Sequence, residues 1–71
     1  MNLYEDEPIF MLRAADFHAP RAVTHWARTV IQNPKSTEYQ FRQATQALII
    51  ADNMHEWQQN NPEKVKLPDK I

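Results

Sequence analysis

The stretch S36-T-E-Y-Q-F-R-Q-A-T-Q-A-L-I-I-A-D-N-M-H-E-W-Q-Q-N60 decides the fold of this chain. At the helical period of about 3.6 residues, its apolar side chains cover about half of the circumference, whereas a surface helix usually shows an apolar arc nearer 100°. Ile49 points away even from this arc. A helix coated in this way needs several neighbours, and the sequence therefore predicts self-association or a protein partner. The arc consists of Tyr39, Phe41, Ala44, Ala47, Leu48, Ile50, Ala51, Met54 and Trp57.

A shorter amphipathic helix is expected before this stretch, over residues 20–32. Asn33-Pro34 ends it, because the residue before a proline disfavours the α region. The long helix is expected over residues 37–59, since Thr37 followed by Gln40 fits a capping box. The sequence thus predicts a mainly α fold, an antiparallel helical hairpin with Trp26 at the hub of its contact. The apolar repeat of the first helix is Val23, Trp26, Ala27, Val30 and Ile31.

The segment before the hairpin, residues 9–14, has two interpretations. With a period of two, Phe10 and Leu12 face one side and their neighbours the other, which favours a short strand. With the helical period, Asp6 could cap a helix instead. We expect a short strand or an extended segment. The remaining divisions are a flexible acidic lead-in over residues 1–7, a single small helical domain over 8–60 and a mobile tail over 61–71.

The composition excludes several classes of function. The 71 residues include no cysteine and no glycine, which excludes disulfides, thiolate metal sites and glycine-rich phosphate loops. The formal net charge of −1 gives no general attraction to nucleic acid or anionic membranes. The acidic start lacks the features of a signal peptide, and the longest apolar run, Ala47–Ala51, is far too short to span a bilayer. We therefore expect a cytoplasmic protein without a membrane segment.

Catalytic and metal-binding patterns are weak. His18, His25 and His55 show no metal-binding spacing, and the pair Asp52/His55 supplies only two ligands. The only serine, Ser36, stands at the expected start of the long helix. The sequence predicts no enzyme, no metal and no cofactor.

The expected role is binding to a protein. One edge of the long helix has no assured partner within the chain, and Trp and Tyr are enriched among interface anchors. We therefore expect a homodimer, or a complex with a host or phage protein, through Tyr39, Ile49, Ile50, Met54 and Trp57.

A nucleic-acid interpretation is the alternative. A strand followed by two helices looks like the order of elements in ribbon-helix-helix repressors, whose paired strands enter the major groove. Such a regulator needs outward basic side chains, and the candidates for nucleic-acid contact are Arg13, Arg21 and Arg28.

Three segments, E7-P-I-F-M-L-R-A-A-D16, A19-P-x-x-V-x-x-W-A27 and A51-D-x-M-x-x-W-Q58, together resemble a group of small phage and prophage proteins. The shared pattern is EPxFxLRAxDxxAP, then WA, then ADxMxxWQ, and it covers most of residues 7–58. The resemblance implies a phage or prophage origin and carries no biochemical role. The sequence therefore predicts a phage-type accessory protein in a bacterial host that acts by stoichiometric protein–protein binding, for example by occluding a host factor.

Overall fold

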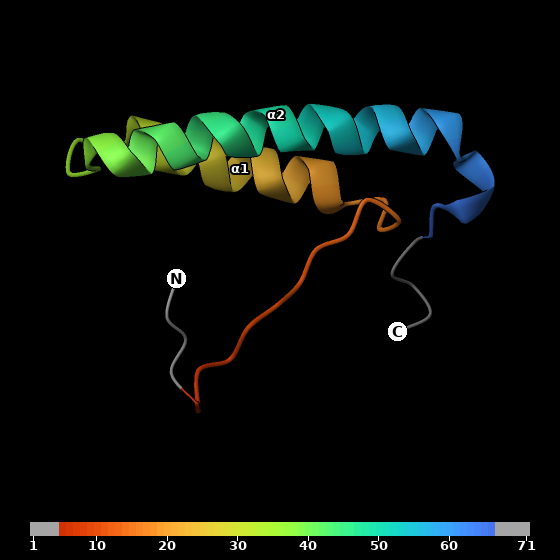
Figure 1. Ribbon diagram of the computed structural model, residues 1–71, viewed down its shortest axis with the longest axis horizontal. Helices are drawn as coiled ribbons and strands as arrows, with labels where there is room; N and C mark the ends of the chain where they lie inside the picture. Colours follow the sequence, from red (N-terminus) through yellow and green to blue (C-terminus); the bar gives the residue numbers. More distant parts are fainter. Residues whose placement is uncertain (1–4, 67–71) are drawn as a thin grey trace.

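The computed structural model describes residues 5–66 as a helical hairpin with an N-terminal extension. Helix α1 spans Ala19–Gln32, helix α2 spans Glu38–Asn60, and the short 3-10 helix η1 spans Pro62–Lys64. The two long helices lie side by side and are joined by a tight loop, so they run antiparallel (Figure 1). The predicted hairpin is confirmed, and its helix ends fall within one residue of the predicted ones.

Side chains at the helix ends explain where the hairpin turns. The Thr37 hydroxyl accepts the Gln40 N–H at 3.2 Å, and the Gln40 carboxamide oxygen accepts the Thr37 N–H at 2.8 Å, which completes the predicted capping box. The Ser36 hydroxyl donates to the Val30 carbonyl at 2.6 Å, at the end of α1. These bonds give partners to backbone N–H and C=O groups at the helix ends, which have none within the helix, and they hold the loop tightly between the two helices.

The contact between α1 and α2 is a seam of alanines. Ala27 and Ala44 are fully buried, as is Ala19, and Ala51 is nearly so; no larger side chain is buried among the described residues. Ala44 and Ala51 are seven residues apart and therefore share one line along α2. Because a methyl group is small, a contact made by alanines lets two helices pack more closely than one made by large side chains.

The prediction that Trp26 forms the hub of the hairpin is wrong. Its side chain is 50% exposed. Ala27 is fully buried in the contact, and consecutive residues of a helix point about 100° apart, so Trp26 lies at the flank of the seam. The buried contact is made by the methyl groups of alanines, and the larger indole of Trp26 lies outside it. The larger side chains of Val23, Val30 and Leu48 are accordingly half-buried beside the seam.

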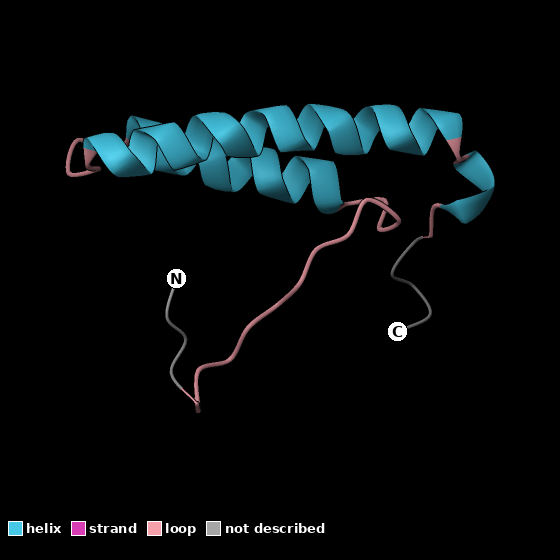
Figure 2. Cartoon of the chain, viewed as in Figure 1, coloured by secondary structure: helices cyan, strands magenta, loops and turns pink. Residues whose placement is uncertain are grey.

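Residues 7–13, which we name the arm, belong neither to a helix nor to a strand. The arm runs from the hairpin as an elongated trace (Figure 2). The structure forms no strand over residues 9–14, one of the two conformations expected there. A strand needs a neighbour for its backbone hydrogen bonds, and no segment of the described chain lies beside the arm as one.

The root of the arm is fastened to the end of α2. The Gln58 side-chain amide donates to the Ala14 carbonyl at 3.0 Å and to the Asp16 carbonyl at 2.8 Å. The Lys66 N–H donates to the Ala15 carbonyl at 2.8 Å, and the Phe17 N–H donates to the Lys66 carbonyl at 3.0 Å, forming an isolated parallel bridge. The segment 61–71, expected to be a mobile tail, thus begins with η1 and this bridge. Residues 67–71 of that segment, and residues 1–4 of the expected lead-in, lie outside the described residues.

Candidate protein-binding surface

A shallow apolar groove lies along one side of the alanine seam. We name it the tryptophan groove, and its volume is about 570 Å³. Trp26 reaches it from α1, and Ala47 and Ile50 reach it from α2. Trp26 and Ile50 are each about half exposed, with 50% and 49% of their surface open to solvent. The complete lining is Trp26, Tyr39, Arg42, Gln43, Gln46, Ala47 and Ile50.

The groove collects part of the predicted interface. Tyr39 and Ile50 both line it. Met54 and Trp57 follow Ile50 at i+4 and i+7, so they continue the same side of α2, where both are half-buried. Sequence reasoning did not place Trp26 on this surface, because its position in the apolar repeat of α1 indicated the core.

Ile49 lies apart from the groove. It is 50% exposed, almost the same as Ile50, yet it does not line the groove. The two neighbours point about 100° apart on α2, as the helical period requires. The structure therefore separates Ile49 from the other predicted interface residues and makes it a natural comparison for Ile50.

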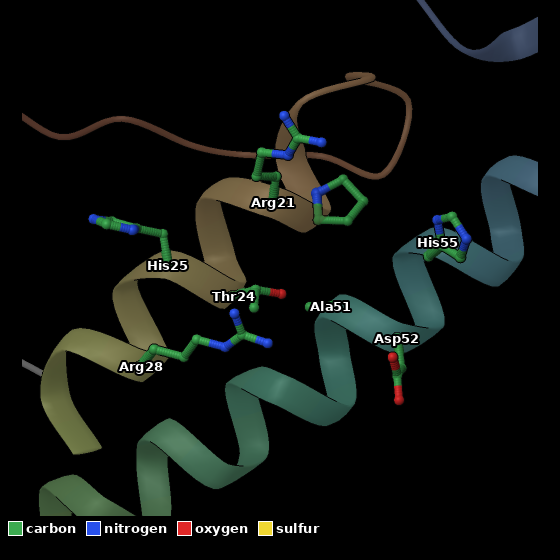
Figure 3. Close-up of a pocket in the computed structure, with 8 residues that line it drawn as sticks. Arg21, Thr24, His25, Arg28, Ala51, Asp52 and His55 are labelled. Atoms are coloured by element: carbon green, nitrogen blue, oxygen red, sulfur yellow. The ribbon is translucent and has the colours of Figure 1, made fainter. Parts of the chain in front are cut away.

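The opposite side of the seam carries a polar groove of about 500 Å³. Arg28 extends from α1 toward α2, whereas Arg21 and His25 point outward (Figure 3). Asp52 and His55 line this groove from α2 without a hydrogen bond between them, and the nearest partner of the His55 ring is the Gln59 amide at 3.2 Å. Within residues 5–66, no three histidine or carboxylate side chains come together as a metal site.

The three arginines suggested for nucleic-acid contact are divided. Arg21 and Arg28 are seven residues apart on α1 and line the same polar groove, with Thr24 between them. Arg13 lies in the arm, outside that groove.

The arm itself exposes three consecutive apolar side chains. Ile9, Phe10 and Met11 are 65%, 83% and 79% exposed. Single exposed apolar residues are common on protein surfaces, but a contiguous set indicates an interaction site. Gln58, which fastens the root of the arm, was not singled out from the sequence; the one signal for it is the final position of the ADxMxxWQ pattern.

Within the described residues, no helix is long and apolar enough to cross a bilayer. Comparison of this chain with protein-family models, with curated proteins and with solved structures gave no match.

Proposed function

We propose that this chain acts by stoichiometric protein–protein binding, that it forms a homodimer through the tryptophan-groove side of the hairpin, and that it is a phage-type accessory protein, as its sequence pattern implies. One observation supports the proposal above all others. The buried residues of the described chain are all alanines, while the large apolar side chains of the groove and the arm remain exposed.

A second copy is the occupant that the burial pattern favours. Fully burying a large apolar side chain contributes about 1.5–3 kcal/mol, and the lone hairpin gains this in full from none of its larger residues. Chains below about 70–80 residues rarely draw enough stability from one core, and oligomerisation is a common remedy. The radius of gyration, 14.0 Å, also exceeds the value of about 11 Å expected for a compact chain of this length. Pairing of two hairpins supplies the missing core.

The dimer, in turn, presents its remaining exposed surface to another protein. Binding of this kind needs no catalytic residues, only a shape and a set of anchors that a host or phage protein recognises. An accessory protein of this type occludes or modulates its target at a fixed ratio.

Capture of a partner protein from a bacterial lysate tests the proposed binding. Three versions of the chain serve as immobilised baits: the unchanged protein, Ile50→Glu and Ile49→Glu. We expect one protein to be retained by the first and third baits and to be absent from the second. The purified partner should then titrate the chain at a fixed molar ratio in calorimetry. Identical retention by all three baits would contradict the proposal that the partner binds the dimer, because Ile50→Glu is expected to dissociate the dimer.

A second candidate function is DNA binding by a ribbon-helix-helix-like regulator, with residues 9–14 pairing as strands in the dimer. The observation in its favour is the placement of Arg21 and Arg28 along one groove. A protein that neutralises phosphates releases counterions, so its affinity for DNA falls as the salt concentration rises. When the logarithm of the affinity is plotted against the logarithm of the salt concentration, each neutralised phosphate makes the slope steeper by about 0.9. In a titration of duplex DNA, Arg21→Ala and Arg28→Ala should each weaken binding and flatten this slope.

Arg42→Ala is the matched control for the DNA titration, because Arg42 lines the opposite groove and pairs with Glu38 at 3.3 Å. An equal effect of all three substitutions would contradict a specific role for the polar groove, and the absence of any salt-dependent binding would contradict DNA binding altogether.

A further inference from the structure

We propose that the arm of one copy inserts into the tryptophan groove of a second copy, and that the exchange is reciprocal. This inference rests on the proposed homodimer and assigns the element that joins its two halves. The arm supplies exposed apolar side chains without a receptor, and the groove is an apolar receptor without an occupant. Each copy carries both, so a two-fold arrangement uses every arm and every groove.

The arm is prepared for insertion. Its apolar residues form one continuous run, Ile9–Leu12, of which the first three are exposed and Leu12 is half-buried. In an extended chain Phe10 and Leu12 point to the same side. With Phe10 in the groove, its ring would lie against Trp26 and Ile50. A phenyl ring removes about 150–250 Å² from water when it is buried, a substantial part of the roughly 800 Å² that each partner contributes to a stable interface.

The root of the arm favours a second copy over the arm's own hairpin. The bonds from Gln58 and Lys66 fix the backbone at residues 14–17, and from there the arm diverges from the helices (Figure 1). Turns favour Gly, Pro, Asn, Asp or Ser, and residues 9–13, which carry the apolar run, contain none of them, so the sequence of this run favours an extended chain over a turn. An arm that continues outward reaches about 17 Å over five residues and meets a neighbouring molecule.

Charge complements this placement. The arm is preceded by the acidic residues Glu5 and Asp6, and Arg42 lines the groove close to Tyr39. An inserted arm would bring these carboxylates near a guanidinium that now makes only an exposed pair with Glu38. The complementarity favours the arm of another copy over a neutral apolar peptide as the occupant.

Disulfide trapping tests the assignment directly, because the chain has no cysteine of its own. We would mix the full-length variant Met11→Cys with a mass-tagged full-length variant Gln46→Cys under mild oxidation. Gln46 lies at the groove and makes no hydrogen bond through its side chain among the described residues, so its replacement removes no such bond. The expected product is the mixed covalent dimer. Thr45→Cys, exposed on the adjacent position but outside the groove, is the matched control and should give little of it.

Two trapping results would overturn the assignment. The Met11→Cys chain joining only to itself would show that arms pair with arms. A Met11→Cys/Gln46→Cys double variant closing within a single chain would show that the arm folds back onto its own groove.

A polar substitution in the arm separates this inference from the proposed dimer. Phe10→Ser is expected to raise the dimer dissociation constant by at least about tenfold in sedimentation equilibrium. Ile31→Ser, a comparable change outside both the arm and the groove, should leave it within about threefold. An unchanged dimer in Phe10→Ser would overturn the arm assignment and leave the homodimer intact, whereas the absence of any dimer in the unchanged protein would overturn both.

Discussion

Replacing Ala44 by leucine should lower the melting temperature of the protein by about 4–24 °C. Ala44 is fully buried in the seam between α1 and α2. A leucine there forces the backbones apart or takes a strained rotamer, and overpacking of this kind costs about 1–3 kcal/mol. In a domain of this size, each kcal/mol shifts the melting temperature by about 4–8 °C.

Ala22→Leu is the matched control, because Ala22 lies on α1 with its side chain exposed. Leucine and alanine have similar helix propensities, so this change should alter the free energy of unfolding by no more than about 0.5 kcal/mol. Thermal unfolding followed by circular dichroism compares the two variants. If Ala44→Leu melted together with Ala22→Leu, close packing through the alanine seam would be the wrong description of the hairpin.

Replacing Ile50 by glutamate should dissociate the dimer. The change removes an apolar side chain from the tryptophan groove and would place an unpaired carboxylate in the interface. The two effects together should weaken association by about 3 kcal/mol, which is more than a hundredfold in the dissociation constant. Because Ile50 is half exposed in the single chain, the hairpin itself should keep its helical circular dichroism at high protein concentration.

Ile49→Glu provides the comparison. It makes the same chemical change, one residue earlier, at a side chain of nearly equal exposure that does not line the groove. An interface confined to the tryptophan-groove side therefore predicts a large effect at Ile50 and a small one at Ile49. Equal dissociation by both substitutions would mean that the contact surrounds α2, and unfolding of Ile50→Glu at high concentration would place Ile50 in an obligate core.

The hairpin was predictable because its signals are local. The apolar repeat, the Asn33-Pro34 break and the Thr37–Gln40 capping box each act within a few residues, and the structure places the helices accordingly. Helix ends of this kind follow from propensity and capping alone.

The packing of the hairpin could not be predicted in the same way. An apolar arc shows which side of a helix faces inward, but it does not show how closely the two backbones approach. A large hub residue and a seam of methyl groups both satisfy the same periodic pattern. Whether Trp26 or Ala27 is buried between the helices depends on the geometry of the two helices together.

The hydrogen bonds at the root of the arm are non-local. Gln58 bonds to backbone carbonyls more than forty residues earlier in the chain, and no spacing rule predicts such a pair. For the same reason, the sequence could not decide between a strand and an extended segment for residues 9–14. A strand needs a neighbouring strand for its backbone hydrogen bonds, and the arm's own sequence does not supply one.

The molar mass in solution is the most direct test of the central claim, that the exposed apolar side of this alanine-packed hairpin is covered by a second copy. Light scattering after size exclusion would measure it for the unchanged protein and for the Ile50→Glu and Ile49→Glu variants. We predict twice the 8.4 kDa chain mass for the unchanged protein and for Ile49→Glu, and 8.4 kDa for Ile50→Glu. An unchanged protein of 8.4 kDa that melts cooperatively and binds no hydrophobic dye would contradict the claim.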